Sequence, residues 1–299
     1  MSHDDHHTPH HGHQHGHGSH DHGSHDFDGH DHGNEAALAD MLDLDAEVLH
    51  EYLAEVTDLI HQHAGNGPVR RILDMGAGTG NGALVLTRRF PEAEATAVDA
   101  SAFMLAHLQD KARAGGVADR IHTLQADLDS GWPDLGAVDL AWASNSLHHM
   151  ADPVRVLNDL FGTIRPGGLL ALAELNSMPR FLSGESGELE ERCHTALAAE
   201  TAEHVPHLGA DWAPMLTKAG FDIEAERHFD ISLTPPLPPA VGRYAHATLE
   251  RMRSGVAERL SPADLTALDT LLAEGPDGIA ALPGLTVRAE RSIWIARRP

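Results

Sequence analysis

The sequence has one cysteine, no long apolar run and no apolar segment near its N-terminus of the kind that directs secretion. A single thiol, Cys193, excludes an internal disulfide framework and a metal site built from several thiolates. No apolar stretch approaches the roughly 18 residues that a membrane-spanning helix requires. These absences predict a cytoplasmic protein without a membrane partner.

Basic residues are also scarce, since 21 Lys and Arg face 45 Asp and Glu, and the net charge is −24 with histidine neutral. Binding to nucleic acid rests on Lys and Arg that meet phosphates, so this balance disfavours a nucleic-acid partner and an anionic membrane surface. The 299 residues, 41% of them hydrophobic, suffice for one large domain or for a domain with an accessory piece.

Histidine is abundant, and 13 of the 25 histidines lie within the first 32 residues, among Gly, Asp and Ser. Residues 1–34 have no periodic apolar face to offset the entropy of ordering, so we expect a disordered tail. Imidazole suits Zn, Ni and Cu, and candidate ligands are His13, His15, His17, His20 and His22. A flexible tail fixes no geometry, which argues against a catalytic metal.

Residues 35–69 carry apolar side chains at three- and four-residue spacing, which predicts one or two amphipathic helices. Tyr52 is a candidate for a pocket within this segment.

The segment Arg70–Gly82 (RRILDMGAGTGNG) reads as a strand, a glycine turn and the start of a helix. Glycine permits positive φ and, having no Cβ, lets a ligand approach the backbone. The helix N-terminus behind the turn offers free N–H groups. Gly78, Gly80 and Ala83 fit a dinucleotide fingerprint, so the glycines alone leave two cofactor classes open.

Further strands and helices alternate, which is typical of a doubly wound sheet. Asp99 ends the next expected strand, where a carboxylate accepts hydrogen bonds from ribose hydroxyls in either cofactor class. Met104 follows one helical turn later. Asp127 and Leu128 end a third strand, and Asn145 lies in the loop after the fourth, at the carboxyl edge where open α/β sheets bind ligands.

Asp74 and the glycines form Asp-x-Gly-x-Gly-x-Gly, which resembles the first motif of class I S-adenosylmethionine-dependent methyltransferases. A carboxylate suits a ligand with a sulfonium and an amino group, whereas it would repel a pyrophosphate. The run from Leu147-His148-His149 through Asp152-Pro153 to Arg165-Pro166-Gly167-Gly168 also resembles small-molecule methyltransferases, including the ubiquinone and menaquinone type.

The resemblance implies a Rossmann-like α/β fold: a seven-stranded, mostly parallel sheet with helices on both faces. It implies a helical lid over 35–69 and a methyltransferase domain over 70–299, with helical inserts at about 176–208 and 235–275, the second before the last strand. It also places Asp127 at the adenine amino group. The residues expected to contact S-adenosylmethionine are Asp74, Gly76, Ala77, Gly78, Gly80, Asp99, Ala100, Met104, Asp127, Leu128 and Asn145.

Methyl transfer requires donor and acceptor to be held close together, and a general base only when the acceptor must lose a proton. Candidates for this chemistry are His148, His149 and Glu174. Weaker candidates for the acceptor pocket are His194, His204, His207, Trp212 and Tyr244.

We therefore expect methyl transfer to a small-molecule acceptor, with O-methylation slightly favoured. Two alternatives stay open: a metal-responsive protein with a repurposed methyltransferase domain, and a nicotinamide-dependent oxidoreductase. Asp74, Asp127 and the Arg-Pro-Gly-Gly run argue against the oxidoreductase.

Overall fold

The computed structural model describes Met1 and residues 28–65, 67–275 and 278–299, so the tail histidines named as metal ligands lie outside the described residues. The elements in chain order are α1 (Asp28–Val48), α2 (His50–Ala64), β1 (Arg71–Met75), α3 (Asn81–Arg89), β2 (Glu94–Asp99), α4 (Ala102–Ala114), η1 (Ala118–Arg120), β3 (Ile121–Gln125), β4 (Val138–Ser144), η2 (Leu147–His149), α5 (Pro153–Thr163), β5 (Ile164–Leu175), α6 (Gly184–His204), α7 (Ala213–Lys218), β6 (Asp222–Leu233), α8 (Val241–Val256), α9 (Pro262–Leu272), η3 (Ile279–Ala281) and β7 (Val287–Arg297). Helix α1 begins at Asp28, inside the segment that the sequence assigns to the tail.

The strands form one seven-stranded sheet in the order β3-β2-β1-β4-β5-β7-β6. Strands β1 to β5 pair in parallel, whereas β7 pairs antiparallel with both β5 and β6. The expected mostly parallel, Rossmann-like sheet is thereby confirmed. The strand order reverses between β1 and β4, and such a reversal opens a crevice for ligands at the carboxyl ends of the strands.

Apolar side chains cover both faces of this sheet. Val56 and Ile60 of α2, Leu84 of α3 and Leu108 of α4 pack on one face. Helices α5 and α7 pack on the other. The central strands are buried on both sides, which explains why β1 and β4 read as continuous apolar runs instead of alternating ones.

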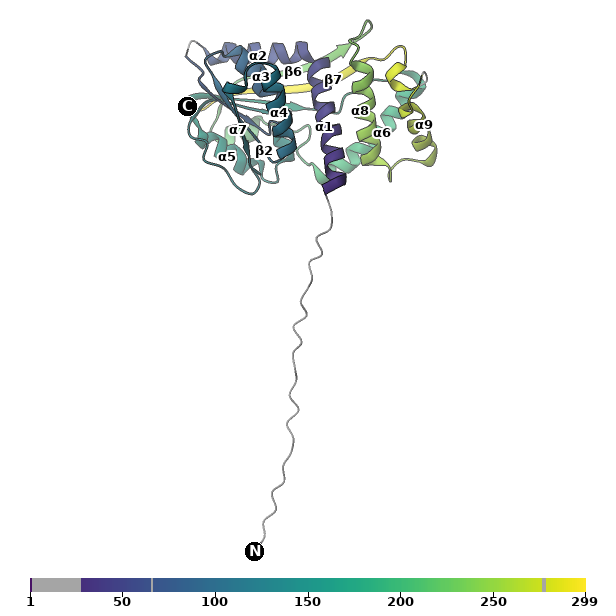
Figure 1. Ribbon diagram of the computed structural model, residues 1–299, viewed down its shortest axis with the longest axis horizontal. Coiled ribbons are helices and arrows are strands. Elements are labelled where there is room, and N and C mark those ends of the chain that lie inside the picture. Colours follow the sequence, from purple (N-terminus) through teal and green to yellow (C-terminus); the bar gives the residue numbers. More distant parts are fainter. Residues whose placement is uncertain (2–27, 66, 276–277) are drawn as a thin grey trace.

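A third apolar cluster lies beside the sheet, where α6, α8 and α9 gather around the end of α1 and the start of β7. Figure 1 shows α6, α8 and α9 grouped at one end of the molecule, with α1 between them and α4. Phe181 and Tyr244 meet edge to face in this cluster, with ring centroids 5.1 Å apart. We call the group formed by α6, α8 and α9 the cap.

Local sequence sets the start of several helices. Ser101 accepts a hydrogen bond from the Met104 amide at the start of α4, and Asp152 does the same for Arg155 before Pro153 of α5. Among the described residues, no helix is both long and apolar enough to cross a membrane.

Candidate functional site

The glycine turn between β1 and α3 is tight enough to exclude side chains. Gly76 has φ of 62°, and a Cβ there would lie 2.5 Å from the Ser146 Cβ. Gly80 has φ of 76°, and a Cβ there would lie 2.2 Å from Leu108. Both positions therefore require glycine for conformation and for space. Gly76, Ala77 and Gly78 stay partly accessible at the end of β1.

Asp74 lies beneath this turn and is only 2% exposed. Its Oδ2 accepts a hydrogen bond from the Ala83 amide at 2.7 Å. Burial raises the pKa of Asp74 to about 7, against the effect of the Ala83 amide and with a contribution from Asp99. In this structure Asp74 braces the first turn of α3, while its predicted contact with a cofactor stays a prediction.

Asp99 ends β2 and is oriented by two backbone amides. Gly78 donates to Oδ2 at 2.8 Å and Ser101 donates to Oδ1 at 2.9 Å. Each carboxylate oxygen has a second lone pair that these bonds leave open. Because the side chain is partly exposed beside the glycine turn, it is a pre-oriented acceptor for a pair of hydroxyl groups.

The other residues expected at a nucleoside lie around the ends of β2 and β3. Ala100 and Asp127 are exposed, whereas Met104 and Leu128 are almost fully buried. Asp127 accepts from the Asp129 amide at 2.9 Å and from the Ser130 hydroxyl, and these bonds lower its pKa. Asp127 therefore organises its own turn at the edge of the site.

Asn145 follows β4 and is the one non-glycine residue of the described chain with positive φ, at 50°. Its Oδ1 is buried and has no hydrogen-bond partner among the described residues. Strained backbone conformations and unsatisfied buried acceptors concentrate at binding sites. This unpaired acceptor lies at the switch point between β1 and β4, where a bound ligand would be able to donate a hydrogen bond to it.

Glu174 of β5 fixes the loop that carries the two adjacent histidines. It is 2% exposed, and its carboxylate accepts from the Leu147 amide at 2.9 Å and pairs with His148 Nδ1. His148 is buried and lies against His149, with ring centroids 4.1 Å apart and the rings tilted by 48°. His149 is exposed, and loss of solvation together with His148 and Arg251 lowers its pKa to about 4. His148 and Glu174 form a satisfied pair, so their catalytic role stays a prediction.

Helix α1 crosses the carboxyl edge of the sheet. Glu35 contacts the Ser101 hydroxyl at the end of β2. A Cβ on Gly78 would meet Leu42 at 3.2 Å, so α1 passes directly over the glycine turn. Further along, Asp45 reaches Arg291 of β7 at 3.1 Å. The helix thus runs from the end of β2 toward the cap.

Asp43 holds α1 on the turn, a role that the sequence analysis missed. Its Oδ1 accepts from the Thr79 hydroxyl at 2.7 Å and from Asn81 at 3.2 Å, and it also pairs with Lys111. Its Oδ2 pairs with His107 at 2.8 Å. Despite partial burial, these bonds lower the pKa of Asp43, with Lys111 contributing most. The sequence signal that would have identified Asp43 is a carboxylate near the apolar face of an amphipathic helix.

The weaker pocket candidates divide between core and surface. Trp212 is buried in the core on the α5 side of the sheet, and His194 is buried in α6, where desolvation lowers its pKa to about 4. His204 is exposed, and His207 is partly exposed. Tyr52 and Tyr244, by contrast, both lie beside α1 near Asp45 and Arg291. Within the described residues, no group of three His, Cys, Asp or Glu side chains is arranged to hold a metal ion.

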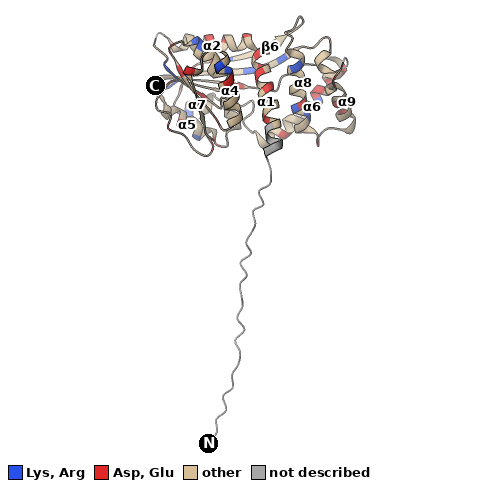
Figure 2. Cartoon of the chain, viewed as in Figure 1, with Lys and Arg blue, Asp and Glu red and all other residues tan. Residues whose placement is uncertain are grey.

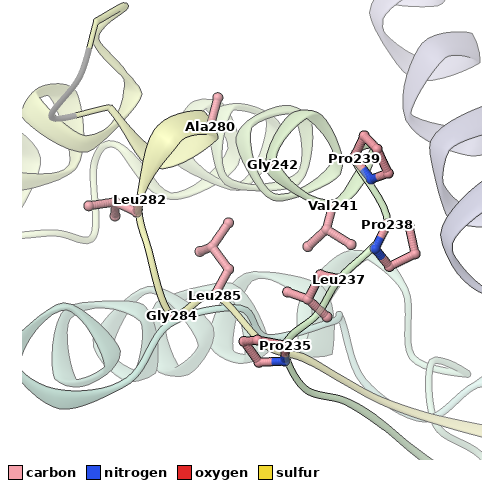
Figure 3. Close-up of a pocket in the computed structure, with 10 residues that line it drawn as sticks. All are labelled: Pro235, Leu237, Pro238, Pro239, Val241, Gly242, Ala280, Leu282, Gly284 and Leu285. Carbon is pink, nitrogen blue, oxygen red and sulfur yellow. The ribbon is translucent and has the colours of Figure 1, made fainter.

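Two surface hollows lie outside the turn Gly76–Gly80, and the second reaches its neighbours Asp43 and Asn81. Figure 3 shows a cavity of about 260 Å³ between the proline-rich loop and the start of α8, lined by Pro238, Val241 and Leu285 among others. A groove of about 780 Å³ runs between α1, α2, α3 and α4, bordered by Leu53, Val85 and Arg88. None of the residues of Gly76–Gly80 lines either hollow.

Comparisons with known proteins bear on the same half of the chain. Residues 72–168 match the family described as "Methyltransferase domain". The chain is 32% identical over 141 residues to 27-O-demethylrifamycin SV methyltransferase of Amycolatopsis mediterranei, covering 46% of this chain and 50% of that protein. It is 38% identical over 112 residues to demethylmenaquinone methyltransferase of Thermus thermophilus, covering 37% and 50%. The chain thus spans about half the length of these curated relatives.

Solved structures share the fold over a longer stretch. The YcgJ protein of Bacillus subtilis aligns with a TM-score of 0.52 at 16% identity, covering 82% of this chain and 98% of that one. A Bacillus halodurans structure that carries a methyltransferase designation aligns with a TM-score of 0.51 at 16% identity, covering 81% and 98%. These matches show that residues 72–168 are similar to a methyltransferase domain and that the described chain shares the fold of these solved structures.

Proposed function

We propose that the protein transfers a methyl group from S-adenosylmethionine to a small-molecule acceptor, with an oxygen as the favoured methylated atom. The observation that carries the proposal is the line of groups along the carboxyl edge. In sheet order, β2 ends at Asp99, β1 leads into the turn Gly76–Gly78, and Asn145 follows β4, all beneath α1. The relatives named for methylating a rifamycin and a menaquinone precursor support a small acceptor.

The chemistry of these groups fits the cofactor. The Asp99 carboxylate has open lone pairs for two ribose hydroxyls, and the unpartnered Asn145 Oδ1 suits a positively charged amino group. Met104 in the first turn of α4 and Leu128 after β3 are buried apolar residues beside the expected adenine position. S-Adenosylmethionine supplies an activated methyl group, and the protein's own task is to hold acceptor and donor together and to exclude water. Helix α1 passes over the glycine turn and is placed to exclude water from the reacting groups.

Calorimetric titration with S-adenosylhomocysteine, S-adenosylmethionine and NAD tests the cofactor class. We expect micromolar binding of both adenosyl ligands and none of NAD. Replacing Asp99 with Ala removes the ribose acceptor and weakens adenosyl binding at least tenfold, about 1.4 kcal/mol. Asp119→Ala, an exposed aspartate on η1, is the matched control and leaves affinity unchanged.

Binding of NAD in place of the adenosyl ligands would overturn the proposal. Unchanged affinity in Asp99→Ala would overturn the ribose assignment alone. Because Asp99 also orients Gly78 and Ser101, the unfolding midpoint of each variant is measured alongside.

We also propose that the tail histidines His13, His15, His17, His20 and His22 bind transition-metal ions separately from methyl transfer. The proposal rests on the imidazole spacing in the sequence.

A further inference from the structure

Asp45 lies on the acceptor side of the site. It follows Leu42 by three residues, which is about one turn of α1, and Leu42 packs over Gly78 of the glycine turn. Its partner Arg291 sits on β7 opposite Leu175, directly beside Glu174 at the end of β5. In sheet order, β7 lies beyond β4 and β5, on the opposite side of the glycine turn from Asp99. Asp45 therefore lies at the β5 and β7 side of the candidate cofactor residues, on the side away from Asp99.

One oxygen of Asp45 is saturated and the other is open. Oδ1 accepts from the Tyr244 hydroxyl and from Arg291 Nη2 at 3.1 Å. Within the part of the chain that the structure describes, Oδ2 has no hydrogen-bond partner, and the side chain is 27% exposed. Tyr244 and Arg291 thus fix the carboxylate and leave one acceptor atom available.

The neighbouring groups are also incompletely paired. Arg291 is only 3% exposed, yet its Nε is a buried donor with no partner among the described residues. Leaving such a donor unsatisfied costs about 1–3 kcal/mol, so natural proteins rarely do this without a reason. Tyr52 is half-buried, and its hydroxyl makes no hydrogen bond to the described residues. Burial raises the pKa of Tyr52 far above its usual value, Arg291 lowers it, and Asp45 and Glu174 raise it, so the hydroxyl stays protonated among these three charges.

We propose that Asp45 is the proton acceptor for methyl transfer to a neutral hydroxyl group, an alcohol or phenol, which Tyr52 orients. This inference rests on the proposed function. The reaction replaces the acceptor's O–H bond with an O–CH₃ bond, and it releases S-adenosylhomocysteine and one proton. Asp45 Oδ2 receives that proton.

The available groups select a hydroxyl over other acceptors. Asp45 Oδ2 offers one acceptor and Tyr52 offers one O–H donor, which together match a group that donates once and accepts once. A carboxylate acceptor would meet the negative charges of Asp45 and Glu174, and the single positive charge of Arg291 is already in an ion pair with Asp45. An ammonium group has no lone pair to accept from Tyr52, and the nitrogen lone pair of a neutral aniline, delocalised into the ring, is a weak acceptor.

The test compares three probes that differ in one group: 4-ethylphenol, 4-ethylbenzoate and 4-ethylaniline. Each is titrated calorimetrically into the full-length protein saturated with S-adenosylhomocysteine, and methyl transfer from labelled S-adenosylmethionine to each is measured in parallel. We expect the phenol to bind and to be methylated in preference to the other two. Asp45→Asn, which keeps shape and loses basicity, should lower the transfer rate at least a hundredfold, and Tyr52→Phe should weaken phenol binding at least fivefold.

Asp40→Asn is the matched control, because Asp40 is an exposed aspartate on the same helix. It should change neither binding nor transfer. Binding of S-adenosylhomocysteine to each variant is measured first and reports folding and the cofactor site. If the wild-type protein fails to bind this ligand, the proposed function itself falls. If it binds but the phenol is not bound, if the benzoate or aniline is preferred, or if Asp45→Asn retains full transfer, the inference on Asp45 alone is overturned.

Discussion

Two aspartates at neighbouring strand ends show how position decides the chemistry of one residue type. Asp99 is partly exposed at the end of β2 and keeps lone pairs open toward the site. Asp74 lies one residue before the end of β1, is enclosed beneath the turn and serves the Ala83 amide. The carboxylate that carries the resemblance in sequence is thus the one that the fold buries.

Asp74 should make stability depend on pH. Its pKa in the folded protein is raised to about 7 from an ordinary value of 3.8, so the folded state holds the proton more tightly than the unfolded state. The stabilising contribution is complete below about pH 4 and is lost as the pH rises through 7, by at most about 4 kcal/mol.

Asp74→Asn cannot titrate and can still accept from Ala83. Urea unfolding of both proteins at pH 4, 5.5 and 7.5 isolates the effect, because all other groups are common to both. The free energy of unfolding of the wild type, relative to the variant, should fall across this range. A constant difference would show that Asp74 titrates near its ordinary value.

At the scale of elements, α1 is the piece that joins the two halves of the site. Four of its residues make contacts along its length. Glu35 contacts the end of β2 and Leu42 contacts the glycine turn, while Asp43 contacts the side of α3 and α4 and Asp45 contacts β7. Figure 2 shows acidic positions recurring along α1 where it crosses the other elements. The helix is therefore held over the site by charged and polar contacts and by Leu42, and its end packs through apolar side chains in the cap.

Asp43→Ala should loosen this fastening. The change leaves Lys111, His107 and Thr79 without their shared carboxylate, at a cost of about 2 kcal/mol in unfolding free energy. Hydrogen exchange of the α1 amides should accelerate at least tenfold, and S-adenosylhomocysteine should dissociate faster. Asp40→Ala on the same helix gives the baseline. Unchanged exchange in α1 would mean that its apolar contacts alone hold it.

At the scale of the whole molecule, strand β7 joins the apolar core of the sheet to that of the cap. Strand β7 contributes Val287 and Ala289 to the cap cluster and Ile293 and Ile295 to the sheet core. One strand therefore belongs to both apolar clusters. The tail histidines, in contrast, precede the first described helix in the sequence and lie outside the described residues.

Removing residues 2–27 should separate the two proposed properties. We expect affinity for S-adenosylhomocysteine to stay within twofold of the full chain, because Asp99 and the glycine turn are intact. Binding of Zn²⁺ and Ni²⁺, measured by calorimetry, should be lost. If truncation abolishes binding of the adenosyl ligand, or if the truncated protein still binds the metal ions, the proposal that tail and domain bind different ligands is contradicted.

The sequence by itself determined the parts whose chemistry is local. The turn Gly76–Gly80, Asp99 at a strand end and the caps Ser101 and Asp152 depend on residues a few positions apart, because φ, helix starts and strand ends are set over short distances. The alternation of strands and helices then predicted the sheet.

Only the tertiary structure decided the acceptor side. Asp45 and Arg291 are 246 positions apart, and no local pattern can state that α1 brings them together. The alternation of β7 does place Arg291 on the same face as Val287, Ala289, Ile293 and Ile295, an unusual place for a charge. That pattern indicates a buried arginine. Only the packing of helices against the sheet shows that its partner is Asp45, and that one oxygen of Asp45 is paired while the other is open.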